Sequence, residues 1–353
     1  MLGYFTASAE NIRGLAQIYK QTSEIISNLL GYFTLLVIFA NMRWWFVAIF
    51  YLISAINIHG QRFRVATWNI ENAFDTIHDK GKDDMEFLPT AERKWHSGRY
   101  WHKLRGITQT IAAMELPALI GIQEVENDTV LRDLTRRTAL WSARYKFVMT
   151  DCDDTRGVDV ALLYKPEVFQ LFSWHAVRIP STENGLLPTR DILVASGIVG
   201  KDTLNICVVH LPSRRNNNRA TKLNRALAVQ TLCHTLDSLQ GQKTLVIGDF
   251  NAEPGDKIFD SLGRYATTLL PTDKKTLYDK RGTYYFRGEW GFLDHILASK
   301  ELHHYSIGEA EECRFTWLLR TSKQIPHRTY GGNSYLGGIS DHLPLICDFE
   351  LRR

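Results

Sequence analysis

The segment Ser340-Asp341-His342-Leu343-Pro344 stands just before the last apolar run of the chain. From Leu345 to Leu351 apolar residues occupy alternate positions, which is the period of a half-buried strand. Neighbouring residues of a strand point to opposite faces, so Asp341 and His342 can reach one site only from a loop. We therefore expect this strand to begin near Pro344 and both side chains to lie at a sheet edge.

Four similar polar clusters precede this segment, each at the end of an apolar run, and a fifth lies between the last of them and Ser340. In chain order they are Thr67-Trp68-Asn69, Gln123-Glu124, His210-Leu211-Pro212, Gly248-Asp249-Phe250-Asn251-Ala252 and Leu293-Asp294-His295. Carboxylates, amides and imidazoles at strand ends can hold a hard divalent cation and a phosphate in one cleft. Together the clusters predict a metal-assisted phosphoester hydrolase.

Strand and helix periodicities alternate along the chain after about residue 60. Apolar strand patterns cover 63–69, 118–122, 158–163, 204–209 and 244–247, and helical spacing covers 104–114 and 232–239. This interleaving predicts an α/β layered protein whose polar clusters gather at one edge of its sheets. No long linker, repeat or low-complexity stretch interrupts it, so we expect one domain over residues 61–353.

Asp249 and Asn251 are two residues apart, which would place both side chains on one face of an extended segment. Asp249 is a candidate general base or water-orienting group, and Asn251 a candidate donor to a phosphoryl oxygen. A simple turn cap after Gly248 is the alternative interpretation. Glu124 follows a buried strand, where a lone carboxylate is costly. A bound Mg²⁺ or Mn²⁺ would offset that cost, whereas a surface glutamate at a strand end is the alternative.

His210 and His342 both lie at strand boundaries beside a proline. In phosphodiester cleavage an imidazolium can donate to a non-bridging oxygen and stabilise the transition state. To carry a charge near neutral pH it needs a carboxylate partner, and Asp294 is the candidate partner of His342.

Two further segments suggest contacts with a polymeric substrate. The basic run 213–219 continues to Lys222 and Arg225, and Arg215 within it is a candidate contact to backbone phosphates. A solvated loop and helix start explains this run equally well. The aromatic segment 284–290 predicts a hairpin that could stack a base or sugar, although packing in a sheet is the more common use of such residues.

The first 60 residues form a separate leader. Residues 29–56 are almost continuously apolar, which predicts a membrane-targeting segment. Met42-Arg43 is followed by the short apolar run 44–55 and then by polar residues, the parts of a secretory signal peptide. Translation starting at Met42 with export, or a membrane anchor over 29–56, both place the catalytic domain outside the cytoplasm. A buried soluble helix is the remaining alternative.

Length, composition and charge limit the classes of protein to which this chain can belong. The 353 residues are 44% hydrophobic and 23% charged, which is ordinary globular usage. A net charge of +4 is too small for a protein that coats nucleic acid nonspecifically, so any phosphate affinity must be local. The five cysteines include no CxxC pair, which argues against a zinc site or a dense disulfide framework. We expect Cys207 and Cys347 to be buried thiols in strands.

The order and spacing of the six clusters resemble the endonuclease/exonuclease/phosphatase superfamily, which includes deoxyribonuclease I and exonuclease III. The resemblance covers residues 62–352. It implies a four-layered α/β sandwich of two packed, mostly antiparallel sheets with helices outside and one cleft at the sheet edges. It also implies that Asn69 and Glu124, with Asp341, hold the metal.

By the same resemblance Asp249 and Asn251 position water and phosphate, His210 and His342 stabilise the phosphorane, and Asp294 orients His342. One departure concerns His210: deoxyribonuclease-like members pair this histidine with a glutamate on the strand that here runs over 158–164. This sequence offers only Asp159 and Arg156 in that neighbourhood, and we take Arg156, like Arg215, as a candidate contact to the substrate.

The leading hypothesis is therefore an extracytoplasmic endonuclease, secreted, periplasmic or membrane-anchored, that uses Mg²⁺ or Mn²⁺ to cleave nucleic acid by in-line attack of water. A phosphatase or lipid phosphodiesterase of the inositol phosphate or sphingomyelin type is the alternative within the superfamily. A membrane-associated binding module with a decayed site belongs to another class. No protein partner is indicated.

Overall fold

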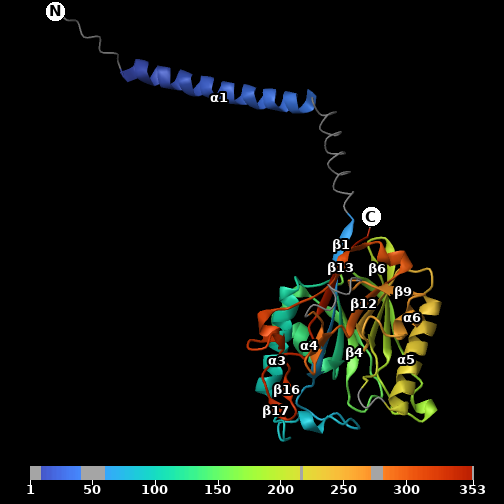
Figure 1. Cartoon of the computed structure of the whole chain (residues 1–353). Helices are drawn as coiled ribbons and strands as arrows, with labels where there is room; N and C mark the ends of the chain where they lie inside the picture. Colours follow the sequence, from blue (N-terminus) through green and yellow to red (C-terminus); the bar gives the residue numbers. More distant parts are fainter. Residues whose placement is uncertain (1–8, 41–59, 215–217, 272–280, 352–353) are drawn as a thin grey trace, which may run out of the picture. The chain divides into compact units, whose positions relative to one another are not determined.

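The computed structural model describes residues 9–40, 60–214, 218–271 and 281–351 (Figure 1). The chain divides into two units, Met1–His59 and Gly60–Arg353. The described part of the first unit is one helix, α1 (Ala9–Ala40). The expected signal sequence, with Met42 and 44–55, lies outside the described residues. Among the helices that are described, none has the length and apolar character needed to cross a membrane.

The second unit contains two six-stranded sheets, which lie face to face (Figure 1). The first sheet has the order β13-β18-β1-β2-β4-β3, and the second has the order β5-β6-β7-β8-β12-β9. The first consists of β1 (Gln61–Ala73), β2 (Leu119–Val125), β3 (Lys146–Met149), β4 (Asp159–Tyr164), β13 (Ser306–Glu312) and β18 (Leu345–Leu351). The second consists of β5 (Gln170–Val177), β6 (Ile192–Val199), β7 (Asp202–His210), β8 (Thr244–Asp249), β9 (Ala266–Thr268) and β12 (Asp294–Ser299).

Each sheet contains one parallel pair, β1 with β2 and β7 with β8, and its other described pairs are antiparallel. The predicted mostly antiparallel sheets are thus confirmed. Both parallel pairs are joined by long connections that include a helix, as parallel pairing requires. The last strand begins at Leu345, directly after Pro344 as expected.

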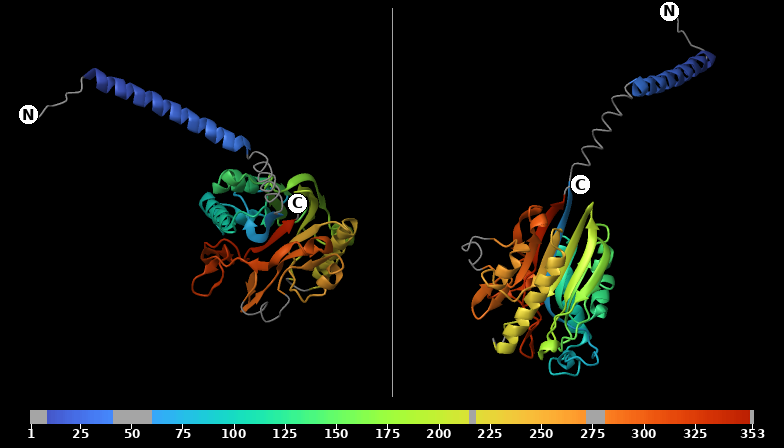
Figure 2. Two further views of the ribbon diagram at one scale, coloured as in Figure 1. Left: turned by 90° about the horizontal axis from the view of Figure 1, so that it is seen from above. Right: turned by 90° about the vertical axis from the view of Figure 1, so that its right-hand side faces the viewer.

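Three buried clusters separate the four layers of the sandwich. The middle cluster lies between the sheets and includes Val65 and Ile247. A second packs α3 (Ser97–Ala113) and α4 (Asp128–Arg136) on the first sheet, and a third packs α5 (Arg219–Ser238) and α6 (Ile258–Leu262) on the second (Figure 2). The predicted helical spacings fall in α3 and α5. The four-layered α/β sandwich is therefore confirmed.

Short elements complete the described chain. They are η1 (Met85–Phe87), η2 (Ala139–Ala143), η3 (Thr182–Asn184), η4 (Thr316–Leu318), α8 (Lys300–His303), β10 (Tyr284–Phe286), β11 (Glu289–Gly291), β14 (Leu319–Arg320), β15 (Ile325–Pro326), β16 (Tyr330–Gly331) and β17 (Ser334–Tyr335). The aromatic hairpin expected over 284–290 is β10–β11, a two-stranded sheet separate from both large ones. Within this hairpin the Tyr285 and Trp290 rings pack edge to face at 5.4 Å and Trp290 contacts a core cluster, whereas Phe286 is 57% exposed.

Cysteine usage matches the sequence prediction. All five thiols are free, and Cys207 and Cys347 are buried in β7 and β18. Both act as small apolar residues of the core.

Candidate active site

Three strands of the second sheet bring His210, Asp249 and Asp294 into one row. The parallel pairing of β7 with β8 sets His210 opposite Asp249, and the antiparallel pairing of β8 with β12 sets Asp294 opposite Asp249. All three side chains are at least 95% buried. Residues far apart in sequence thus become neighbours through sheet register alone.

Gly248 makes this close packing possible. Its φ of +148° belongs to the region that favours glycine, and a Cβ at this position would collide with the carbonyl oxygen of Val209 on β7. Any side chain here would push β8 away from β7 and separate Asp249 from His210.

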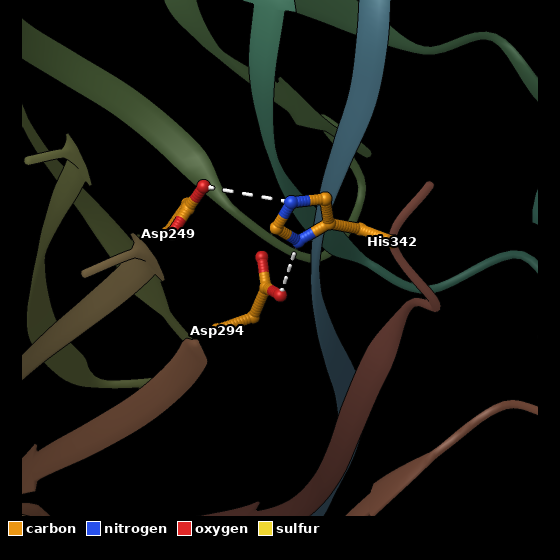
Figure 3. Close-up of side chains that lie close together, drawn as sticks. All are labelled: Asp249, Asp294 and His342. Atoms are coloured by element: carbon orange, nitrogen blue, oxygen red, sulfur yellow. Dashed lines mark hydrogen bonds and ion pairs between the residues drawn. The ribbon is translucent and has the colours of Figure 1, made fainter. Parts of the chain in front are cut away.

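His342 reaches the row from the loop before β18 and lies between two carboxylates (Figure 3). Its Nδ1 is 2.7 Å from Asp294 Oδ2, and its Nε2 is 3.9 Å from Asp249 Oδ2. The pairing with Asp294 expected from the sequence is therefore present. Burial acts to lower the pKa of His342, but the Asp294 charge and hydrogen bond, with Asp249, raise it to about 10. The imidazole is consequently held protonated.

The loop that carries His342 is fixed to β1. The Ser340 hydroxyl donates to the Asn69 carbonyl oxygen at 2.7 Å and accepts from the His342 amide at 3.0 Å. Trp68 Nε1 donates to the carbonyl oxygen of His342 at 3.0 Å. The first sheet therefore aims an imidazole at carboxylates of the second.

Asn69 connects the two sheets directly. Its Nδ2 donates to Asp249 Oδ2 at 3.0 Å, and its Oδ1 accepts from the Glu71 amide at 3.0 Å. Burial raises the pKa of Asp249 to about 7, a shift that the His342 charge opposes and the Asp294 charge increases. Asp249 therefore changes protonation near neutral pH, as a general base should.

Asn251 does not lie in an extended segment with Asp249, so that expectation is wrong. β8 ends at Asp249, and Asn251 adopts a left-handed φ of 47°. Its amide N–H donates to Asp249 Oδ1 at 2.8 Å, while its Nδ2 donates to the Leu211 carbonyl oxygen at 3.0 Å. The Gly248–Asn251 segment is thus both a turn and part of the site. The two interpretations offered by the sequence are compatible.

Glu124 occupies a bulge in the first sheet. The pairing of β2 with β1 and with β4 shifts between Gln123 and Val125, and Glu124 has a left-handed φ of 63°. Such bulges re-aim a side chain and are common beside active sites. The register shift in β1 between Asn69 and Ala73 lies next to it.

The surroundings of Glu124 keep it ionised. Its Oε2 accepts from the Asn72 amide at 2.9 Å and is 3.4 Å from Arg156 Nη2. Burial would raise the pKa of Glu124, but the Arg156 charge and the hydrogen bond from the Asn72 amide outweigh burial, so its pKa lies far below the ordinary value. An ionised carboxylate that is only 13% exposed is suited to a hard cation.

Among the described residues, the carboxylate at ion-pair distance from His210 belongs to Asp249, and β4 offers no glutamate to it. Its Nε2 is 3.6 Å from Asp249 Oδ2, and its Nδ1 has no hydrogen-bond partner among the described residues. Asp159 instead accepts from the Cys152 amide at 3.0 Å, and Arg156 pairs with Glu124. Burial and the nearby Arg190 charge hold the pKa of His210 well below its ordinary value. His210 is therefore neutral where His342 is charged.

Asp341 belongs to a second, partly buried charge cluster, which no motif of the sequence indicated. Arg328 donates to Asp341 and lies 3.6 Å from Glu71, whose other oxygen accepts from the Thr329 amide at 2.7 Å. Lys103 Nζ donates to Thr329 Oγ1 and to the Ile339 carbonyl oxygen, both at 2.8 Å. Burial, then the Asp341 charge, raise the pKa of Glu71 to about 7. A lysine on the apolar face of a predicted helix was the available signal.

Two residue sets offer ligands to a cation. Asp249, Asp294 and His342 each present an atom within 4.8 Å of the others. A protonated imidazole has no lone pair for a metal, however, and its Nδ1 is bonded to Asp294. The carboxylates of Glu124 and Asp341 and the amide oxygen of Asn69 are hard donors and fit Mg²⁺ or Mn²⁺ better. In this structure Arg156 and Arg328 stand beside these two carboxylates.

The predicted substrate contacts are placed only in part. Arg156 adjoins Glu124 and also donates to Asn72 Oδ1 at 2.5 Å. Arg215 lies outside the described residues. Its neighbour Arg214 donates through Nε to the Asn251 carbonyl oxygen at 3.0 Å, and so touches the backbone of the site.

Comparison with known proteins agrees with this arrangement. A model of the Endonuclease/Exonuclease/phosphatase family matches residues 64–351. Nocturnin of Mus musculus is 27% identical over 306 residues, and Nocturnin of Homo sapiens is 26% identical over 306. Each alignment covers 81% of this chain and 65% of the relative, so the chain spans less than two thirds of either relative.

Solved structures share the fold at low identity. The human Nocturnin catalytic domain has a TM-score of 0.53 and 18% identity, covering 82% of this chain and 93% of that one. Humanized D. rerio TDP2 has a TM-score of 0.52 and 13% identity, covering 82% and 99%. The family match extends over nearly all of the second unit. This chain therefore belongs to the endonuclease/exonuclease/phosphatase family.

Proposed function

We propose that this family hydrolase cleaves phosphodiester bonds of nucleic acid, with a divalent metal, by in-line attack of water. The observation that carries the proposal is the buried group of Asp249, Asp294 and His342, in which a carboxylate that titrates near neutral pH faces a protonated imidazole. Acid-base chemistry needs a group that has lost its proton next to a group that has kept one, and this pair provides both.

In this mechanism Asp249 accepts the proton of the attacking water. Its pKa of about 7 leaves a substantial ionised fraction at neutral pH and still makes the carboxylate a useful base. Asn69 holds Oδ2 of Asp249 through its amide, and the Asn251 backbone holds Oδ1. The carboxylate is thus fixed in orientation before substrate arrives.

Hydrogen-bond donors of the site stabilise the negative charge that develops on the phosphoryl oxygens. His342 stays protonated because Asp294 holds its Nδ1, which leaves Nε2 to donate toward the phosphate. His210 is neutral and can contribute one N–H. Asn251 supplies a further amide at the edge of the same group. This donor set is rigid, because each member is held by a second residue or by buried strand register.

Glu124, Asn69 and Asp341 would hold Mg²⁺ or Mn²⁺. A bound divalent ion neutralises charge on the scissile group and eases departure of the alkoxide. In this proposal Arg156 and Arg328 give up their ion pairs with Glu124 and Asp341, and Arg156 becomes available to a phosphate oxygen.

Similarity to Nocturnin and TDP2 supports a phosphoester substrate. The human Nocturnin domain was solved with a bound sulfate anion, a tetrahedral oxyanion of phosphate-like shape and charge. We favour nucleic acid over a small phosphoester or a lipid head group because basic residues follow His210 in the chain.

We further propose that the catalytic unit works outside the cytoplasm, on the basis of the apolar residues 29–56. Cell fractionation of the full chain, with N-terminal sequencing of the mature protein, tests this proposal. A cytoplasmic protein that keeps its first residue would contradict it.

The decisive experiment is nicking of supercoiled plasmid by the purified protein with Mg²⁺, with EDTA, and with the Glu124→Ala and His342→Ala variants. We expect nicking that requires the metal and falls at least a hundredfold in both variants. Release of phosphate or choline phosphate from small substrates without nicking would move the function to the phosphatase or lipid branch. No activity on any substrate would support a decayed binding module.

A further inference from the structure

A groove of about 790 Å³ lies between α5 and α6 on the outer side of the second sheet. Five cationic side chains line it, namely Arg214, Lys222, Arg225, Lys257 and Arg264. We propose that this groove binds the backbone of a nucleic acid strand that extends from the scissile phosphate. The inference rests on the proposed nuclease function and specifies its substrate as a polymer.

The groove begins at the backbone of the active site. Arg214 Nε donates to the Asn251 carbonyl oxygen at 3.0 Å, and Arg225 Nη1 donates to the Pro212 carbonyl oxygen. Asn251 follows Asp249 by two residues, and Pro212 follows His210 by two. The two arginines therefore contact the same chain segments that carry Asp249 and His210, and we expect them to meet the phosphates next to the scissile one.

The positive charge in the groove is largely unneutralised. Among the described residues Lys222 and Lys257 have no carboxylate at ion-pair distance, and Arg264 lies over the Tyr265 ring at 5.7 Å. Arg214 pairs with Asp256 at the groove's edge, and the one lining carboxylate, Asp237, accepts from Tyr265 Oη at 2.8 Å. Burial and the Arg214 charge lower the pKa of Arg225 to about 10. An anionic ligand would relieve this crowding of like charges.

The groove also has apolar lining. Val229 of α5, Ile258 of α6 and the Tyr265 ring contribute to its wall. Cationic side chains around apolar surface match a strand in which charged phosphates alternate with sugars and bases. The groove adjoins the proposed phosphodiester site, which favours a nucleic acid strand as its ligand. A membrane surface could bind a basic groove anywhere on the protein, so this position would have no reason.

The test is binding of a fluorescein-labelled 12-nucleotide single strand to the full chain in EDTA, read by fluorescence anisotropy. The groove variant carries Lys222→Glu, Lys257→Glu and Arg264→Glu, three exposed positions that do not touch the active site. The matched control carries Arg105→Glu, Lys146→Glu and Lys201→Glu, also exposed but outside the groove. Both have the same net charge, and thermal unfolding checks that both fold.

We expect the groove variant to bind at least tenfold more weakly than the control variant. Its dependence of log K on log salt should be shallower by roughly 2, since each lost phosphate contact on a single strand removes about 0.7. A labelled trinucleotide should show little difference between the variants, because it is too short to fill the groove.

Equal binding by the two variants would overturn the groove proposal, whatever the outcome of plasmid nicking. Loss of binding to phosphatidylserine vesicles in the groove variant, with unchanged oligonucleotide binding, would overturn it in favour of a lipid surface. If the wild-type protein binds the 12-mer through the groove but cleaves no plasmid, the proposed function is contradicted and the groove proposal is supported.

Discussion

At the scale of single residues, the site depends on two ionisable groups whose pKa values are both raised, for different physical reasons. Burial raises the pKa of Asp249 to about 7, whereas Asp294 and Asp249 raise the pKa of His342 to about 10 against the effect of burial. Between these values the carboxylate is ionised and the imidazole is charged. That window is the pH range in which the proposed base and donor are both competent.

This pairing predicts a bell-shaped pH profile for kcat/KM. The rate should rise as Asp249 loses its proton around pH 7 and fall as His342 loses its proton around pH 10. In Asp294→Asn the charge that raises the pKa of His342 is gone, so the alkaline limb should move to lower pH and the maximal rate should fall roughly a hundredfold. An alkaline limb that stays in place would show that Asp294 does not control the protonation of His342.

A second residue-level prediction concerns Arg156, which competes with a cation for Glu124. In Arg156→Met the ion pair at 3.4 Å is lost, and Glu124 is left without that counter-charge. Mg²⁺ should then bind several-fold more tightly by titration calorimetry, because no arginine has to be displaced. Activity on plasmid should nevertheless fall about tenfold if Arg156 also contacts phosphate. Weaker Mg²⁺ binding in this variant would show that Arg156 supports the metal site rather than competing with it.

At the scale of elements, β-bulges and one glycine place the reactive groups. Bulges at Glu124 and between Asn69 and Ala73 interrupt ladders that otherwise pair residue by residue. Gly248 lets β8 approach β7 so closely that Asp249 and His210 share a row. These local departures from regular geometry have a cost, which the buried sheets around them offset.

Gly248→Ala should therefore destabilise the protein and the site together. The added Cβ meets backbone that cannot move aside, and the φ of +148° is strained for alanine. We expect a loss of about 2 kcal/mol or more in the free energy of unfolding, measured with urea, and a large loss of activity. Gly255→Ala is the matched control, since nothing lies within 4 Å of its added Cβ. A stable and active Gly248→Ala protein would refute the requirement for close approach.

At the scale of the whole molecule, buried carboxylates make folding depend on pH. Glu126 is 6% exposed, and burial, with the charges of Asp75, Asp79 and Asp84, raises its pKa to about 9. The folded protein therefore holds this proton more tightly than the unfolded chain does. Stability from this group is present below about pH 4.5 and is lost as pH rises toward 9.

Glu126→Gln should stabilise the protein at pH 8 and flatten this dependence. The amide oxygen of glutamine can still accept from the Asp75 N–H, which is 2.6 Å from Glu126 Oε2. The folded variant then no longer has to bind a proton that the unfolded chain has released. The expected gain is about 2 kcal/mol in the free energy of unfolding at pH 8, with little change at pH 4.5. Glu183→Gln, at an exposed position, serves as the control. An equal gain at both pH values would point to a cause other than ionisation.

Much of the architecture could be predicted from periodicity. The alternation from Leu345 to Leu351 and the helical spacing over 104–114 both correspond to observed elements. Hydrophobic period is a local property, so it survives in a short window of sequence. The polar residues at the ends of these strands were equally visible, because His-Leu-Pro and Gly-Asp interrupt the apolar pattern that precedes them.

What the sequence alone determined was therefore the layered fold, the identity of most polar groups at the sheet edge and the pairing of His342 with Asp294. Only the tertiary structure decided which charges meet across the sandwich. The cluster of Glu71, Lys103 and Arg328, the bulge at Glu124 and the groove between α5 and α6 join residues from separate elements. Such contacts depend on strand register and on the packing of the layers, which the whole core sets. No single segment therefore shows them as a periodic pattern of hydrophobic residues.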